Sequence, residues 1–186
     1  NNGLILASNS KPKNTQYYFR EGITWSTTGG KFASFRLMPE GELFDIKGSS
    51  IFPNIADVIE ILLGFLNSCV ARNVIGVLTP TLDYNPGYIA KIPTSINIKQ
   101  REQVIDSIKA TIRVEKNDWD FFETSWDFGS QPLLNPVYRQ PTLKDIYQKL
   151  RAHWRKMTLE MQRLEVENNR IFIEAYGLQD ELTPDV

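Results

Sequence analysis

Residues 143–175 read LKDIYQKLRAHWRKMTLEMQRLEVENNRIFIEA and place a side chain on one stripe alternately every four and every three residues. The stripe consists of Leu143, Tyr147, Leu150, Trp154, Met157, Met161, Leu164, Asn168, Ile171 and Ala175. Only Asn168 among them is strongly polar. A repeat that averages 3.5 residues is typical of a coiled-coil seam. At 1.5 Å per residue the helix is about 50 Å long, so we expect it to pack against a partner helix.

Local signals also define the two ends of this helix. Pro141 and Thr142 stand where a helix start is expected, and Asp145 occupies its third position. Gly177 follows the last apolar residue and is suited to the left-handed conformation that commonly ends a helix. We therefore predict one continuous helix from about residue 141 to residue 177.

The composition is that of an ordinary soluble globular protein, with 186 residues, 41% hydrophobic and 23% charged. Cys69 is the only cysteine, which excludes an internal disulfide and a cysteine-based zinc site and favours a cytoplasmic setting. No apolar run approaches the roughly 18 residues of a membrane span, so no membrane partner is expected. Because the chain starts at Asn1 without methionine or signal peptide, we interpret it as a fragment of a larger protein.

The net charge of −1 argues against a strongly basic nucleic-acid binder. The charges alternate in blocks, however: residues 1–36 are basic, residues 37–70 acidic, and residues 136–173 basic again. Such blocks permit a locally basic face despite a neutral total. Solvated surface without a binding role is the other interpretation.

Upstream of the long helix, the periodicity predicts a compact body of strands and helices. Short extended or alternating segments are expected at 17–19, 22–25, 32–37, 43–46 and 88–93. Helices are expected from Asn54 to about Arg72 and, after an Asn97–Gln100 capping box, over about 98–114. The predicted fold class is therefore α+β, with a small mixed sheet, packed helices and the long C-terminal helix. The predicted units are 1–97 (globular), 98–140 (helix and aromatic connector), 141–177 (heptad helix) and 178–186 (tail).

Catalytic or metal-binding motifs are hard to find. His153 is the lone histidine, so neither a catalytic triad nor a zinc site is expected. The acids Asp118, Asp120, Glu123 and Asp127 could in principle hold Mg²⁺. They alternate with Trp119, Phe121, Phe122 and Trp126. We instead expect these aromatic rings to pin the connector onto the core, while the acids face water or cap helices.

Small and basic residues in turn-like segments have the chemistry to contact DNA. Serine, threonine and glycine let a backbone approach a groove, and lysine and arginine contact phosphates or guanine. An asparagine amide can pair with adenine, and a tyrosine ring can stack on a base. The candidate DNA-binding residues are Thr27, Thr28, Lys31, Arg36, Lys47, Ser49, Ser50, Tyr84 and Asn85. On these features alone, ordinary hairpin turns explain the segments equally well.

Several ordered blocks resemble a known family. They are GITWS (22–26), FDIKGSSIFP (44–53), LLGFLNS (62–68), TPTLDY (79–84) and IAKIP (89–93), followed by 119–128 and 165–178. Together they look like the C-terminal, target-recognition half of adenine-specific DNA methyltransferases of the type IIG restriction–modification and BREX phage-exclusion kinds. A more distant similarity is to the specificity subunits of type I restriction enzymes. In these families a globular α/β domain reads DNA, and long helices act as spacers.

The resemblance implies a role in selecting a double-stranded DNA site for adenine methylation. The family's Asn-Pro-Pro-Tyr catalytic motif and its motif for S-adenosylmethionine are absent here. Asn85-Pro86-Gly87-Tyr88 and Asn135-Pro136-Val137-Tyr138 both depart from the first motif at its third position. We therefore expect a fragment without activity or cofactor of its own, joined to an upstream methyltransferase domain that uses S-adenosylmethionine.

A second interpretation treats the chain as a protein-binding module of a phage-defence complex. Trp154, Met157 and Met161 on the heptad would be its anchors. Its partners would be other defence-system proteins or a second copy, bound through the long helix. The two interpretations are compatible, because the helix can dock while the loops read DNA.

Overall fold

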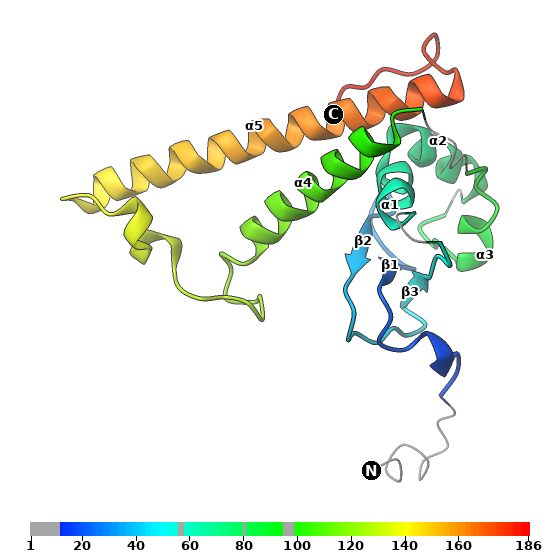
Figure 1. Cartoon of the computed structure of the whole chain (residues 1–186), viewed down its shortest axis with the longest axis horizontal. Helices are drawn as coiled ribbons and strands as arrows, with labels where there is room; N and C mark the ends of the chain where they lie inside the picture. The colour runs from blue at the N-terminus through cyan, green and yellow to red at the C-terminus, as the bar shows by residue number, and fades with distance from the viewer. Residues whose placement is uncertain (1–11, 56–57, 80, 95–98) are drawn as a thin grey trace.

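The computed structural model describes residues 12–55, 58–79, 81–94 and 99–186. A small sheet and short helices form a body, and the long α5 crosses one side of this body and extends well beyond it (Figure 1). The predicted α+β class with a long C-terminal helix is confirmed. No single helix in the described part is long and apolar enough to cross a membrane; only α1 and α2 together pass, as a pair bent by 68°.

The sheet has three strands with β1 (Gly22–Ser26) in the centre, flanked by β2 (Phe35–Met38) and β3 (Gly48–Ile51). Both strand pairs are antiparallel, so the expected mixture of parallel and antiparallel pairing is not found among the described strands. Ile23 and Trp25 of β1 are buried on the core side. Between them Thr24 points to the other side, where it pairs with Arg36 and Ser50. Alternation along β1 thus gives the sheet an apolar face and a polar face.

Two helices stand where one was predicted. α1 (Ile59–Asn67) ends at Ser68, and α2 (Cys69–Leu78) begins at once in a new direction. The Ser68 hydroxyl donates to the Phe65 carbonyl at 2.6 Å and accepts from the Ala71 amide at 3.3 Å. A serine that caps the second helix in this way favours an extended backbone at its own position. The predicted continuous helix from Asn54 to Arg72 was therefore wrong.

Three predicted strands were also wrong. Residues 88–93 contain the end of α3 (Pro86–Ile89) and a turn, because Asn85 caps that helix and Pro86 suits its first position. Residues 43–46 form no strand. The Asp45 carboxylate accepts the amides of Lys47 (2.8 Å) and Gly48 (2.7 Å) and so closes a turn immediately before β3. The predicted extended segment 17–19 begins instead at the last residue of the 3-10 helix η1 (Thr15–Tyr17) and continues as a turn.

The two longest helices follow. α4 (Arg101–Trp119) extends beyond the predicted end at residue 114. The proposed capping residue Asn97 lies outside the described residues, and Gln100 makes no side-chain cap. The short 3-10 helices η2 (Pro132–Leu134) and η3 (Pro136–Tyr138) then lead to α5 (Leu143–Tyr176). The predicted ends of α5 are confirmed: Thr142 accepts the Asp145 amide, and Gly177 is left-handed.

The partner helix of α5 lies within the chain. α5 runs beside α4 and contacts α1 and α2. Asn168 donates to the Gly64 carbonyl of α1 at 2.9 Å, and Asn169 accepts the Cys69 amide of α2 at 2.8 Å. The predicted stripe is buried only in part: Leu150, Leu164, Asn168 and Ile171 are buried, Trp154, Met157 and Met161 half-buried, and Leu143, Tyr147 and Ala175 exposed.

The connector between α4 and α5 differs from the prediction. Phe121 is half-buried and Tyr138 buried, and both rings lie against His153 of α5. Trp119 and Phe122 are exposed, and Trp126 is 99% exposed. The expectation that all four aromatic rings pin the connector was therefore wrong. Phe121 and Tyr138 hold the connector against α5, whereas Trp119, Phe122 and Trp126 face solvent.

Candidate nucleic-acid interface

Three segments that are distant in sequence meet at one end of the sheet. Residues 26–32, 45–49 and 82–85, here called the loop cluster, are joined by backbone hydrogen bonds. The Thr27 amide donates to the Lys47 carbonyl at 2.9 Å, and the Tyr84 amide donates to the Thr27 carbonyl at 2.7 Å. Thr28 and Asp83 form an isolated antiparallel bridge. Two of the predicted DNA-contacting segments and the turn after residue 82 thus form one continuous surface.

Tyr84 anchors this surface to the core. Its side chain is only 3% exposed, and its hydroxyl donates to the Gly30 carbonyl at 2.9 Å. The Tyr84 carbonyl accepts the indole N–H of Trp25 at 2.8 Å. Buried polar groups that are satisfied in this way hold a loop in a single conformation. The tyrosine ring therefore supports the loop cluster from beneath.

The nine candidate residues fall into three groups by burial. The exposed residues are Thr28, Lys31, Arg36, Lys47 and Asn85. Ser50 is half-buried, and the buried residues are Thr27, Ser49 and Tyr84. The buried group shapes the surface: Thr27 joins two segments, and the Ser49 carbonyl accepts the Thr24 hydroxyl at 3.1 Å. Only the exposed group and Ser50 have side chains available to a ligand.

The exposed cations of the candidate set have no carboxylate partner among the described residues. The Lys31 ammonium lies 5.1 Å from the ring centroid of Phe32. Arg36 donates to the Ser26 hydroxyl at 3.1 Å, which turns the guanidinium of β2 toward the loop cluster. Lys47 sits in the turn that Asp45 closes. Because no carboxylate in the described part of the chain neutralises these three side chains, their charges are available to attract the phosphate backbone of a nucleic acid.

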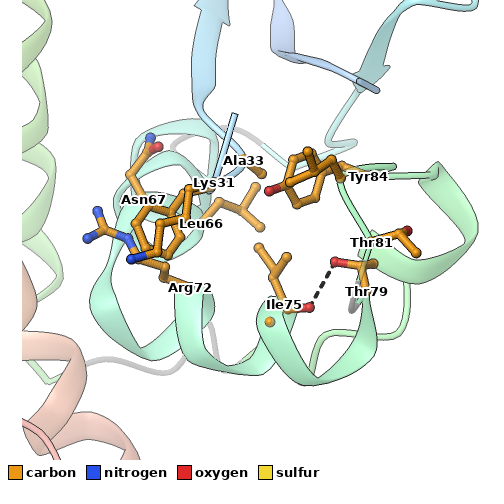
Figure 2. A pocket seen from close by; sticks show the side chains of 12 residues that line it. Lys31, Ala33, Leu66, Asn67, Arg72, Ile75, Thr79, Thr81 and Tyr84 are labelled. Carbon is orange, nitrogen blue, oxygen red and sulfur yellow. Dashed lines mark hydrogen bonds between the residues drawn. The ribbon is translucent and has the colours of Figure 1, made fainter. Parts of the chain in front are cut away.

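A hollow of about 210 Å³ opens between the loop cluster and α2. Figure 2 shows Lys31 and Arg72 on one side of it and Tyr84, Thr79 and Thr81 on the other. The Arg72 guanidinium lies 4.8 Å from the Phe32 ring centroid. Sequence reasoning missed Phe32 and Arg72 because no local pattern relates a loop residue to a helix forty positions later.

The two Asn-Pro segments have structural roles in this chain. The Asn85 side chain accepts the Gly87 amide at 2.9 Å, and the Asn135 side chain accepts the Val137 amide at 3.0 Å. Each asparagine therefore caps the short helix that its proline begins. The capping bond holds the side-chain oxygen of each asparagine at the start of a helix.

The acidic connector is organised around a lysine. Lys116 pairs with Asp120 at 3.0 Å and also with Asp127. Hydrogen bonds from Ser125 and Lys116 lower the pKa of Asp120, and the two carboxylates raise the pKa of Lys116. The ammonium thus occupies the space between the two acids that a cation would need.

The comparisons with known proteins relate the chain to adenine-specific methyltransferases. No family model matches the chain. It is 34% identical over its whole length to the adenine-specific methyltransferase PglX of Lacticaseibacillus casei (strain Zhang). It is 30% identical over 98% of its length to the adenine-specific methyltransferase BrxX of Escherichia coli O9:H4 (strain HS). The chain spans only 16% and 15% of these two relatives. It is therefore homologous to one part of the PglX and BrxX adenine-specific methyltransferases.

Proposed function

We propose that this chain is the DNA target-recognition part of an adenine-specific methyltransferase that acts in restriction–modification or phage defence. The observation that carries the proposal is the loop cluster, in which separate segments are hydrogen-bonded into one surface. This surface presents cations without carboxylate partners in the described chain. The homology of the chain to part of two adenine-specific methyltransferases supplies the chemical context.

Each exposed candidate has a distinct role in this proposal. Lys31, Arg36 and Lys47 contact phosphates or guanine, since their charges face solvent. Thr28 and the half-buried Ser50 contact the DNA backbone or base edges. Asn85 contributes at most its free carbonyl lone pair and amide hydrogens, because its oxygen already caps α3. The buried residues of the candidate set determine where the exposed ones stand.

The chemistry of methylation belongs to another part of the polypeptide in this proposal. The Asn-Pro segments of this chain are used as helix caps, so we assign them neither the target adenine nor S-adenosylmethionine. A base inside a duplex is out of reach of an enzyme, so the enzyme must extrude the adenine into a separate catalytic pocket. The chain would select the site, in the cytoplasm, and the remaining polypeptide would methylate it.

The test is DNA binding by the complete methyltransferase polypeptide, measured by fluorescence anisotropy across a series of salt concentrations. We expect the double variant Lys31→Ala/Arg36→Ala to bind more weakly. The slope of log affinity against log salt should become shallower by about 0.9 for each phosphate that the variant no longer neutralises. Arg113→Ala is the matched control, because this exposed cation lies on α4 outside the loop cluster. An unchanged affinity and slope in the double variant would remove both residues from the DNA surface.

We propose protein docking as a second function, carried by apolar residues far from the loop cluster. Trp126, Leu134, Val137, Leu143 and Tyr147 are all at least half exposed, and they lie on the connector and the distal start of α5 (Figure 1). Exposed aromatic and aliphatic groups of this kind mark contact surfaces. Because the chain spans only 16% of its first relative, the favoured occupant is the remaining part of the same polypeptide.

Cross-linking from position 126 of the complete polypeptide tests this assignment. A photoreactive residue in place of Trp126 should cross-link to residues outside this chain but within the same polypeptide. The same residue in place of exposed Arg113 on α4 should not. Cross-links only between two copies would favour a dimer, and cross-links to neither would leave the surface without the proposed role.

A further inference from the structure

The hollow beside α2 combines a charged edge with an apolar floor. Lys31 and Arg72 both lie over the ring of Phe32, at 5.1 and 4.8 Å from its centroid. A guanidinium that stacks on a ring keeps its N–H groups free to donate in its own plane. The Phe32 side chain is about half exposed, so both cations are held at the mouth of the hollow.

The floor of the hollow is apolar. Ala33, Leu66, Ile75 and Leu82 line it, and Leu66 and Ile75 lie between its two polar sides in Figure 2. A phosphate gains nothing from such a floor, whereas the flat face of a nucleobase buries against it. The volume of about 210 Å³ suits a single small planar group, because pockets for drug-sized ligands start at about 300 Å³.

Most other polar groups of the hollow are already engaged. The Asn67 side-chain amide donates a hydrogen bond to the Phe35 carbonyl at 3.0 Å, and its oxygen accepts one from the Phe35 amide at 3.1 Å. The Thr79 hydroxyl donates to the Ile75 carbonyl at 2.9 Å, as the dashed line in Figure 2 shows. The charged groups that remain, on Lys31 and Arg72, can only donate hydrogen bonds. Their ligand must therefore present acceptors.

We infer that this hollow receives one unstacked guanine, whose O6 and N7 atoms accept from Arg72 and Lys31 while its face lies on the apolar floor. Guanine presents two adjacent acceptors on this edge, whereas adenine presents one acceptor and one donor. The inference deepens the proposed function and rests on it, since DNA bound at the loop cluster would bring an unpaired base to the hollow. The base differs from the adenine that is methylated.

The test uses the complete polypeptide and single-stranded pentamers in which one central base is flanked by abasic nucleotides. The central base is guanine, 7-deazaguanine, adenine or absent. Fluorescence anisotropy should show guanine binding about tenfold more tightly than adenine, because adenine cannot accept a bidentate pair of hydrogen bonds on this edge. The 7-deazaguanine probe lacks the N7 acceptor and should show a much smaller preference.

Two variants of Arg72 keep the test decisive. Arg72→Lys retains the charge but not the planar fork, so it should lose the guanine preference and still bind the abasic probe as the wild type does. Arg72→Ala should also lose the guanine preference while weakening binding of the abasic probe much less than that of the guanine probe, and Arg113→Ala should change neither. If Arg72→Ala weakens binding of all probes equally, the arginine contacts phosphate and the inference is overturned. The inference is also overturned if the wild-type polypeptide binds guanine and adenine probes equally well. The proposed function fails separately, if the wild-type polypeptide does not bind duplex DNA or binds it without any dependence on salt.

Discussion

Replacing Gly64 with alanine should destabilise the fold, although alanine is the better helix former. Gly64 is buried in α1 at the point where α4 and α5 both approach it. A Cβ atom built there would lie 2.9 Å from the Asn168 side-chain oxygen and 3.0 Å from Ile108. The Gly64 carbonyl also accepts the Asn168 amide at 2.9 Å, so any shift of α5 weakens a buried hydrogen bond.

The magnitude follows from two opposing effects. An extra methyl group in a well-packed interior costs about 1–3 kcal/mol, while alanine gains about 1 kcal/mol over glycine inside a helix. Gly64→Ala should thus lose up to about 2 kcal/mol of unfolding free energy. Gly76→Ala is the matched control in α2, because nothing lies within 4 Å of its Cβ position; it should gain about 0.5–1 kcal/mol.

Urea denaturation of both variants, followed by circular dichroism, measures the difference. Because the helix-propensity gain is common to both glycines, the gap between the variants reports the crowding alone, about 1–3 kcal/mol. If Gly64→Ala stabilises the chain as much as Gly76→Ala does, the three helices do not cross as closely as the structure shows.

Three further changes test other contacts, each by denaturation. Ser68→Ala removes the cap between α1 and α2 and should cost about 1 kcal/mol, with Thr158→Ala on the exposed part of α5 as a neutral comparison. Tyr84→Phe removes the bond to the Gly30 carbonyl and should cost about 0.5–1.5 kcal/mol; no loss would mean that the hydroxyl does not hold the loop. Burial, with Glu165 and Asp118 nearby, raises the pKa of Glu115, so the folded chain binds this proton more tightly than the unfolded chain. The stability that this bound proton contributes is therefore present below the ordinary glutamate pKa and is lost as the pH rises through the raised pKa of Glu115. Glu115→Gln should make the free energy of unfolding depend less on pH in this range.

The elements that could be predicted from the sequence are those whose signals are local. α5 has an apolar stripe, a capping threonine and a terminal glycine, and both predicted ends are confirmed. The central strand was predictable for the same reason, since Ile23 and Trp25 alternate with polar neighbours. Signals that act within one turn or one strand survive in the folded chain because tertiary packing reinforces them.

Three of the wrong predictions share a physical cause, which is a polar side chain that outweighs an apolar pattern. Ser68 interrupts a continuous apolar stripe by capping a second helix. Asn85 starts a helix in a segment that otherwise suits a strand. Asp45 closes a turn where alternation indicated an extended chain. In each case a side chain satisfies backbone amides that the predicted element would have used differently.

The candidate site was predictable only as a set of residue types. Thr27, Lys31 and Lys47 were selected for their chemistry, and the structure brings their segments together through long-range backbone hydrogen bonds. The sequence contained no signal for the burial of Tyr84 or for the approach of Arg72 to Phe32. Such proximity depends on how α2 packs after the bend, and packing of distant elements has no local signature.

The long helix and the proposed DNA surface are mechanically connected through α2. Asn169 of α5 accepts the amide of Cys69, the first residue of α2. The Arg72 amide then donates to the Ser68 carbonyl at 3.0 Å, less than one helical turn further on. The first residue of α2 is therefore bonded to α5, three residues before the arginine whose guanidinium lies at the hollow. If the helix docks to another part of the polypeptide as proposed, the same helix also contacts the start of α2 beside the hollow.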